Sequence, residues 1–346
     1  MKHQTTRYGE IPFYKIGTFG NTADAFISKK LFLEYKTKYS FPKKGDVLIS
    51  ASGTIGRAVI YDGKPAYFQD SNIVWIDNDE TLVKNDFLFY AYSNVKWNTE
   101  HTTILRLYND NFRNTLIPLP PLNEQSAIAN ILSALDRYLC ALDALILKKE
   151  GVKKALSFEL LSQRKRLKGF NQAWQKVRLG DIANYSTSNL SVEQITQQGK
   201  IKVYDVNNFI GYTDTTFISD KPYISIIKDG SVGRVRILPP KTNILSTMGA
   251  LIANHRTTTE FLFYLLSNFD FKNFTSGSII PHIYFKDYKE KTIFLPPLNE
   301  QSAIANILSA LDNEIASLKN KKRQFENIKK ALNHDLMSAK IRVLEK

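Results

Sequence analysis

Two long stretches of the chain place apolar residues at alternating steps of four and three positions. The first stretch contains Ile128, Leu132, Leu135, Leu139, Leu142, Ile146, Leu156 and Leu160, with Lys149 and Lys153 in the same register. The second contains Ile304, Leu308, Leu311, Ile315, Leu318, Lys322, Phe325, Lys329, Leu332 and Leu336. This spacing puts the apolar side chains on one seam of a helix, as in coiled coils. It predicts two long helices.

The two predicted helices begin with the same sequence. The 18 residues from Leu119 to Asp136 recur unchanged from Leu295 to Asp312, an offset of 176 residues. A diproline precedes each helix, and Asn123 or Asn299 follows it as a plausible N-cap. Helices of about 40 residues are about 60 Å long, so each needs a partner. We expect an antiparallel coiled coil between two halves related by a pseudo-twofold axis.

The segments in front of the helices are rich in Tyr, Phe, Ile, Val and Thr, and Gly, Asn and Asp interrupt them. Such a pattern predicts short strands over 46–50, 57–61 and 72–76, followed by a helix over 86–93. The expected fold class is α+β, with two β-rich, mixed α/β domains joined by the two long helices. The expected domains are 1–118, 119–168, 169–294 and 295–346.

Composition and charge favour a nucleic-acid partner. The chain has 346 residues and a net charge of +14, with 47 Lys and Arg against 33 Asp and Glu. The positive excess is spread over all four segments, which suits a long polyanion, although it also suits solubility alone. Cys140 is the single cysteine, so it cannot form an intrachain disulfide. With no apolar run of about 18 residues, we expect a cytoplasmic location.

Motifs for catalysis are absent from the sequence. It contains no Gly-x-x-x-x-Gly-Lys-Ser/Thr loop, no Gly-x-Gly-x-x-Gly and no His-Glu-x-x-His. The diprolines are not flanked as in the Asp/Asn-Pro-Pro-Tyr/Phe signature of amino-methyltransferases. We therefore expect a binding protein with no catalytic residue, no metal site and no cofactor.

The repeated Leu-Pro-Pro-Leu-Asn-Glu-Gln block, which enters a heptad helix after each β-rich domain, resembles the specificity subunit of type I restriction-modification systems. The resemblance implies that each front domain is a target recognition domain for one half of a bipartite, asymmetric DNA site. It also implies that the helices dock two DNA adenine methyltransferase subunits, and that restriction subunits join the complex. The chain itself would be non-catalytic.

The near-identity of the repeated block suggests a docking surface, because two identical methyltransferase subunits need two identical places to bind. Its polar members, which we expect to be exposed, are Asn123, Glu124, Gln125, Asn130, Asn299, Glu300, Gln301 and Asn306. Two other interpretations remain open: the block is conserved between the halves because it builds a self-complementary core, or because the duplication is recent.

Candidates for DNA contact are Lys and Arg for phosphates and polar side chains for base edges. One group lies at the turns Gly53-Thr-Ile-Gly-Arg57 and Gly230-Ser-Val-Gly-Arg234, where glycines let the backbone approach a phosphate. Further polar clusters are Gln69-Asp-Ser-Asn72 and the region before each diproline. A plain hairpin turn or a solvated loop explains each of these residues equally well. The candidates are Lys43, Lys44, Ser52, Thr54, Arg57, Gln69, Asn72, Arg106, Tyr108, Asn109, Arg113, Lys228, Ser231, Arg234, Arg236, His282 and Lys286.

The two halves differ at their front. The second begins with Trp174-Gln-Lys-Val-Arg-Leu-Gly-Asp-Ile182, which is typical of the family, whereas the first has no such segment. We expect this front segment to be missing from the first domain. Two alternative functions stay open: a specificity subunit of a type II-like restriction-methylation complex, and a coiled-coil adaptor that binds DNA without specificity.

Overall fold

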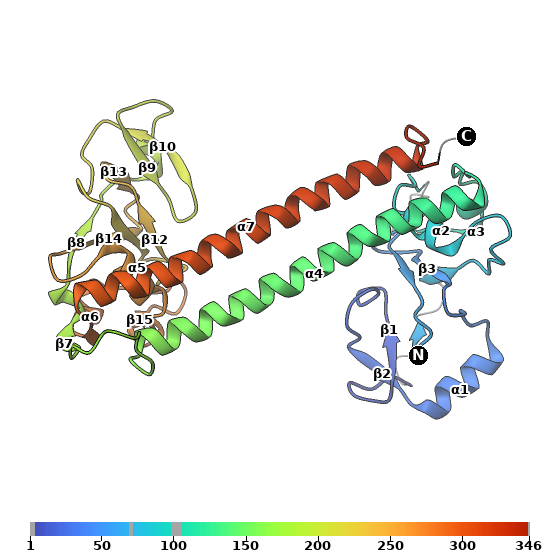
Figure 1. The fold of residues 1–346 in the computed structure, drawn as a ribbon, viewed down its shortest axis with the longest axis horizontal. Helices are drawn as coiled ribbons and strands as arrows, with labels where there is room; N and C mark the ends of the chain where they lie inside the picture. Colours follow the sequence, from blue (N-terminus) through green and yellow to red (C-terminus); the bar gives the residue numbers. More distant parts are fainter. Residues whose placement is uncertain (1–3, 69–71, 98–105, 345–346) are drawn as a thin grey trace. The chain divides into compact units, whose positions relative to one another are not determined.

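A computed structural model describes residues 4–68, 72–97 and 106–344, and the fold divides into two units. Unit 1 comprises residues 1–143 and 320–346, and unit 2 comprises residues 144–319. There are two 40-residue helices, α4 (Leu122–Leu161) and α7 (Leu298–Met337), among the described residues. Each of them has one part in unit 1 and the other part in unit 2. The two long helices predicted from the apolar seam are therefore present (Figure 1).

The described residues of unit 1 form two three-stranded sheets, with strand orders β2-β1-β5 and β4-β3-β6. The predicted strands over 46–50, 57–61 and 72–76 correspond to β3, β4 and β6, and the predicted helix over 86–93 corresponds to α2. The elements are β1 (Ile11–Tyr14), β2 (Ala25–Ile27), α1 (Lys29–Lys38), β3 (Val47–Ser50), β4 (Ala58–Ile60), β5 (Tyr67–Phe68), β6 (Ile73–Trp75), α2 (Asn85–Tyr92) and α3 (Asn109–Arg113).

Unit 2 has the same plan with longer strands. Its main sheet has the order β12-β11-β14-β8, and a second sheet has the order β10-β9-β13. The strands are β7 (Gln175–Arg178), β8 (Ala183–Thr187), β9 (Ile201–Tyr204), β10 (Phe209–Thr213), β11 (Tyr223–Ile227), β12 (Val235–Leu238), β13 (Thr242–Ile244), β14 (Met248–Ala253), β15 (Thr275–Ser276), β16 (His282–Ile283) and β17 (Thr292–Leu295). The helices are α5 (Thr259–Ser267), α6 (Phe285–Tyr288) and the 3-10 turns η2 (Leu179–Asp181), η3 (Val192–Gln194) and η4 (Lys272–Phe274).

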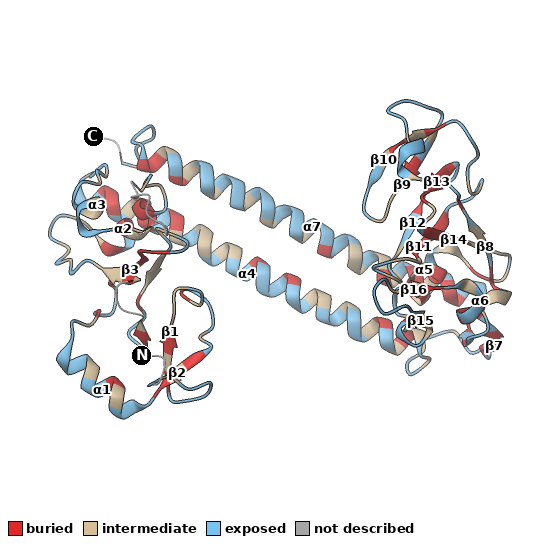
Figure 2. Ribbon diagram, turned by 180° about the vertical axis from the view of Figure 1, so that it is seen from behind, coloured by how far each residue is buried: buried red, intermediate tan, exposed pale blue. Residues whose placement is uncertain are grey.

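In each unit one short helix joins the sheet to the long helices. In unit 1, Phe87 and Tyr90 of α2 pack with Ile128 and Leu132 of α4 and with Leu336 of α7. In unit 2 the corresponding cluster contains α5, Ile304 and Leu308 of α7, and Leu160 of α4. Figure 2 shows the buried residues gathered on the sheets and on α2 and α5. Burial of apolar surface contributes a free energy of about 25 cal/mol per Å², and this stabilises the packing of the sheet against the helices.

The parts of α4 and α7 within each unit pair in antiparallel directions. In unit 1, Lys329 of α7 pairs with Asp136 of α4, and Lys322 pairs with Asp143 at 2.7 Å. In unit 2, Lys153 of α4 pairs with Asp312 of α7, and Lys149 pairs with Glu314 at 2.8 Å. In each unit, residues further along α4 pair with residues earlier in α7, as antiparallel pairing requires.

The starts of the long helices differ from the prediction. The helices begin at Leu122 and Leu298, so Asn123 and Asn299 lie inside the first turn and are not N-caps that precede it. The backbone N–H of Gln125 donates to Pro121 O at 2.9 Å, and Gln301 donates to Pro297 O at the same distance. The second proline of each pair, just before the first helical residue, therefore supplies the carbonyl that starts the helix.

Candidate nucleic-acid interface

In unit 2 the predicted residues gather around a tight turn between β11 and β12. The N–H of Gly233 donates to Ile227 O at 2.9 Å, which closes the turn. Gly230 and Gly233 have φ of +86° and +82°, a region that L side chains rarely adopt. A Cβ on Gly233 would also lie 2.7 Å from the Phe271 ring. The turn therefore requires its glycines, and it exposes Ser231 and Arg234.

Strand β16 brings a second group of predicted residues to this turn. The N–H of Gly230 donates to Pro281 O, and the N–H of Ile283 donates to Lys228 O, both at 2.9 Å. His282 Nδ1 lies 2.7 Å from Asp229 Oδ1. Beyond it, the His282 ring stacks on Tyr284, and Lys286 Nζ lies 5.5 Å from the centre of the Tyr284 ring.

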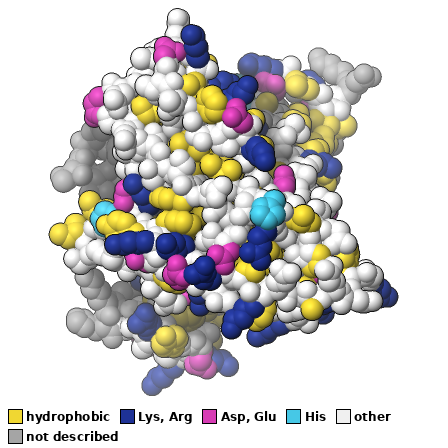
Figure 3. Space-filling view, turned by 90° about the vertical axis from the view of Figure 1, so that its left-hand side faces the viewer, with side chains coloured by type: hydrophobic (Ala, Val, Ile, Leu, Met, Phe, Trp, Pro, Cys, Tyr) yellow, Lys and Arg dark blue, Asp and Glu magenta, His cyan; other side chains and the backbone are white. Residues whose placement is uncertain are grey.

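The cluster that results, Lys228, Ser231, His282 and Lys286 with Tyr284, combines cations, an aromatic platform and backbone exposed by glycine. This combination suits a phosphate and an adjacent base. Figure 3 shows Lys and Arg side chains spread over the face that it draws, with acidic and apolar groups between them.

Unit 1 builds the same arrangement from equivalent positions. The N–H of Gly56 donates to Ser50 O at 3.0 Å, and Gly53 and Gly56 have φ of +67° and +81°. Ser52 forms an isolated bridge with Arg106, the position equivalent to His282. Ser52 Oγ donates to Asn72 Oδ1 at 2.8 Å, and the Arg106 guanidinium lies 5.9 Å from the Tyr108 ring. The structure thus brings together Ser52, Thr54, Asn72, Arg106 and Tyr108.

Other predicted contacts lie away from these clusters. Lys43 and Lys44 precede β3, whereas the turn follows it, and Lys43 pairs with Asp77 at 3.0 Å. Arg57 donates to Phe19 O at 2.9 Å, so its guanidinium lies against the loop that follows β1. Arg113 faces Asp110 at 3.7 Å on α3, which also carries Asn109. Gln69 lies outside the described residues.

The two arginines that follow the turn in unit 2 contact a different loop. Arg234 donates to Asn207 Oδ1 at 3.3 Å, and Arg236 donates to Asn207 O at 2.9 Å. Arg236 also lies 5.3 Å from the Tyr204 ring. Both remain exposed, so their role in DNA contact stays a prediction.

Four of the predicted docking residues are buried, so the expectation that they are exposed is wrong. Glu124 and Gln125 are 3% and 0% exposed, and Glu300 and Gln301 are both 0% exposed. Gln125 accepts from Lys84 N at 2.8 Å and donates to Leu82 O and Pro120 O. Gln301 makes the equivalent bonds to Thr258 N, Arg256 O and Pro296 O. These glutamines tie the helix start to the segment that leads into α2 or α5.

The buried glutamates bind arginines that lie beyond the far end of the other long helix. Arg342 donates to Glu124 through Nε at 3.0 Å and through a terminal nitrogen at 2.6 Å. Arg166 donates to Glu300 in the same way, at 3.1 and 2.6 Å. Hydrogen bonds from Arg342 lower the pKa of the Glu124 carboxyl. Because a carboxylate buried without a partner is costly, these residues are structural, which favours the interpretation of the block as a core.

The four remaining docking candidates, Asn123, Asn130, Asn299 and Asn306, are exposed. Asn123 Oδ1 accepts a hydrogen bond from Glu124 N at 2.9 Å, and Asn299 accepts the equivalent bond from Glu300 N. The Asn130 and Asn306 side chains lie on the exposed face of the helix start. Their docking role remains a prediction.

A repeated network at Asp136 and Asp312 was not anticipated. Tyr264 donates to Asp312 at 2.9 Å and Tyr90 donates to Asp136 at 2.7 Å, while Lys153 and Lys329 pair with the same carboxylates. Burial and then the bond to Asp312 raise the pKa of Tyr264, and Tyr90 shifts in the same direction for the same reasons. The sequence contains a trace of this network, because its tyrosines, aspartates and lysines recur at nearly the same offset in the two halves.

Among the described residues, no group of three or more His, Cys, Asp or Glu side chains could hold a metal ion. Within the same residues, no helix is long and apolar enough to cross a membrane.

Comparison with known proteins identifies the family. The model of the type I restriction modification DNA specificity domain matches residues 1–149 and 171–327, so the chain belongs to this family. Both halves match, as the internal duplication predicts. The comparison thus confirms the resemblance and the α+β fold class drawn from the sequence.

Individual relatives agree with the family match. A Haemophilus influenzae protein named as a type I restriction enzyme specificity subunit is 64% identical over 133 residues, which are 38% of this chain and 34% of that protein. The chain thus matches about a third of that relative's length. The type I restriction enzyme MjaVIII specificity subunit of Methanocaldococcus jannaschii is 25% identical over 92% of this chain and 84% of its own.

A solved structure shows the same fold. The crystal structure of the type I restriction-modification system S subunit from M. genitalium superimposes with a TM-score of 0.63 at 20% identity. The match covers 97% of this chain and 91% of that chain.

Proposed function

We propose that the chain is the DNA-specificity subunit of a type I restriction-modification complex. Residues 1–118 and 169–294 each read one half of a bipartite, asymmetric site on double-stranded DNA. The paired helices dock two methyltransferase subunits, and restriction subunits complete the complex. The observation that carries the proposal is the match of both halves to the DNA specificity domain family.

The two equivalent turns support DNA reading. Each places a glycine-rich backbone beside a cationic or histidine side chain and a tyrosine, in unit 1 at Arg106 and Tyr108 and in unit 2 at His282 and Tyr284. The tyrosine is the same in both units, but the bridge beside the turn joins Ser52 and Arg106 in unit 1 and Asp229 and His282 in unit 2. Equivalent backbone with different side chains is what two half-sites of different sequence require, because the backbone positions the protein and the side chains specify bases.

Exchange of one recognition domain tests the proposal. Replacement of residues 169–294 by the corresponding region of another family member is expected to change one half of the methylated sequence and to leave the other half unchanged. The matched experiment exchanges residues 1–118 and is expected to change only the other half. Methylation mapping in cells that carry the cognate methyltransferase measures both. A change in both halves from one exchange would contradict independent reading.

The exposed asparagines test docking. The pair Asn123→Ala and Asn130→Ala is expected to reduce the number of bound methyltransferase subunits from two to one, and Asn299→Ala with Asn306→Ala is expected to do the same. All four together should abolish docking. Native mass spectrometry of the co-expressed complex measures the stoichiometry. Asn313→Ala with Asn327→Ala, also exposed on α7, is the control. If the fourfold variant still binds two methyltransferase subunits, these asparagines are not part of the docking surface.

A further inference from the structure

A short hairpin in unit 2 exposes two isoleucines at its tip. Its strands are β15 and β16, and residues 277–281 connect them. The Ile279 side chain is 92% exposed, more than any other large apolar side chain of unit 2, and Ile280 is 55% exposed. Exposed apolar side chains that are scattered over a surface need no explanation. The surroundings of this adjacent pair therefore have to indicate whether it has a role.

Both strands of the hairpin are held against the turn between β11 and β12. The N–H of Gly230 donates to Pro281 O at 2.9 Å, which fixes the start of β16. On the side of β15, Thr275 Oγ1 donates to Phe271 O at 2.9 Å, and the Phe271 ring packs on Gly233 of the turn. The tip is therefore attached to the turn that carries the candidate DNA contacts.

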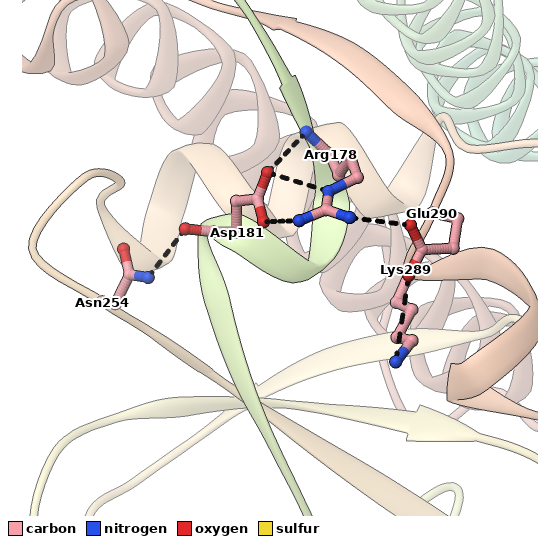
Figure 4. Close-up of polar contacts among 5 residues, drawn as sticks. All are labelled: Arg178, Asp181, Asn254, Lys289 and Glu290. Carbon is pink, nitrogen blue, oxygen red and sulfur yellow. Dashed lines mark hydrogen bonds and ion pairs between the residues drawn. The ribbon is translucent and has the colours of Figure 1, made fainter.

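The chain that leaves the hairpin is fixed as well. After α6, Lys289 O accepts a hydrogen bond from Gly180 N of η2 at 2.8 Å. Figure 4 shows the Arg178 guanidinium between the carboxylates of Asp181 and Glu290, to which it donates at 3.0 and 3.1 Å. Because these contacts hold the supports of the tip in place, little conformational entropy is lost when the tip binds another molecule.

The shape of the tip leaves both faces of Ile279 free. Gly277 has φ of +91°, and a Cβ at this position would collide with Ile280 O, so the sharp bend requires glycine. A side chain that is 92% exposed has little contact with its own protein on either face. An apolar side chain that reads a thymine methyl group needs one free face. A wedge needs two, because a base stacks on each side of it, and Ile279 offers both.

The groups beside the tip favour DNA as the molecule that it contacts. The tip leads directly into the cluster of Lys228, Ser231, His282, Lys286 and Tyr284. The Asp229 carboxylate, which would repel a phosphate, lies 2.7 Å from His282 Nδ1 and is paired with it. Cations, exposed glycine backbone and an aromatic ring around an apolar tip are groups with which proteins hold phosphates and insert side chains between bases. The cores of protein–protein interfaces are instead depleted in charged residues.

We propose that Ile279 is a wedge that enters between two adjacent base pairs of the half-site read by residues 169–294. This role rests on the proposed function, and it adds a contact that depends on how easily one base step unstacks. Pyrimidine–purine steps unstack most easily, so we expect the wedge to select such a step without hydrogen bonds to base edges. Residues 101–105, which correspond to this tip at the offset of 176, lie outside the described residues of unit 1.

Duplexes that carry 2-aminopurine test this role, because the fluorescence of this base rises when it unstacks. The base is placed at one position at a time in the half-site that methylation mapping assigns to residues 169–294. The protein is the full chain co-expressed with its methyltransferase, and the adenine to be methylated is left out because methyltransferases flip it. The wild type is expected to raise the fluorescence at one step. Ile279→Ala should lose this rise, whereas Ile279→Leu, which also provides an apolar wedge, should keep it.

Two controls separate the wedge from a general loss of binding. Val192→Ala, at another exposed apolar position of unit 2, should keep the rise in fluorescence. Ile279→Ala should weaken duplex binding by less than about tenfold and leave its salt dependence unchanged, because the substitution removes no charge.

A rise in fluorescence that persists in Ile279→Ala, or no rise at any position of a bound duplex, would overturn the wedge and leave DNA recognition standing. In the second case, a thymine-to-uracil replacement that weakens binding of the wild type but not of Ile279→Ala would assign Ile279 to a methyl contact. A lower number of bound methyltransferase subunits for Ile279→Ala in native mass spectrometry would make the tip a protein-docking site instead. If the wild-type complex does not bind duplexes that contain its methylated sequence, the proposed function and the wedge both fail.

Discussion

Replacement of Glu300 by alanine is expected to lower the free energy of unfolding by about 3 kcal/mol. The Glu300 carboxylate is 0% exposed and accepts hydrogen bonds from Arg166 and from Trp174 Nε1, the latter at 2.9 Å. Its loss would leave a half-buried guanidinium and a buried indole N–H without their acceptor. Urea denaturation monitored by tryptophan fluorescence measures the change, because Trp174 reports directly on this site.

The duplication supplies a matched control. Glu124→Ala removes the equivalent carboxylate in unit 1, where Arg342 is half exposed and the backbone N–H of Val343 also donates to Glu124. Its effect is expected to be smaller, since water can solvate the released guanidinium. Glu300→Gln, which keeps the shape and an acceptor, should fall between the wild type and Glu300→Ala. If Glu124→Ala and Glu300→Ala lower the free energy of unfolding equally, burial of the hydrogen-bond donors does not determine the size of the decrease.

Removal of three cations at the unit 2 turn is expected to weaken DNA binding by about two orders of magnitude at physiological salt. The variant combines Lys228→Ala, Arg234→Ala and Lys286→Ala. If all three side chains contact phosphates, the slope of log affinity against log salt should become shallower by about 3. The measurement is a salt titration of duplex binding by the complex co-expressed with its methyltransferase.

A control with the same change of charge separates a local contact from net charge. Lys200, Lys221 and Lys241 are exposed, and Lys221 precedes β11 whereas the turn follows it. Their replacement by alanine is expected to change the affinity much less. Equal losses in the two triple variants would mean that the overall charge of +14, and not the turn, governs binding.

The architecture could be predicted because the sequence itself contains the duplicated block and the heptad pattern of both long helices. The heptad seam and the identical block predicted α4 and α7, and short runs of β-branched and aromatic residues between turn residues predicted β3, β4 and β6. Ile128 and Leu132, which the seam assigned to the core, are 1% and 0% exposed. These features follow from local periodicity, which a single sequence displays directly.

The burial of Glu124 and Glu300 could not be predicted in the same way. A charged residue at a helix start is usually exposed, and its burial depends on an arginine that arrives from a distant part of the chain. Arg166 and Arg342 share the offset of 176 residues, so the pairing left a trace in the sequence. Only the fold shows that each arginine lies beside the glutamate of the other copy of the block.

The local structure around the candidate DNA contacts was predicted in part, and their contact with DNA stays a prediction. Glycines at fixed spacing predicted the two turns, because positive φ and close packing require them. Residue type made Lys43 and Lys44 candidates for DNA contact, but they lie at the end of β3 opposite the turn. Residue type alone does not predict whether a side chain lies at the same end of a strand as the other residues of a site.

Mapping of methylated adenines in cells that express this chain with its methyltransferase shows whether the two recognition domains read two half-sites. We expect one methylated sequence made of two different, defined half-sites separated by a gap of fixed length in which no base is specified. A single continuous recognition sequence, or methylation without any sequence preference, would contradict it.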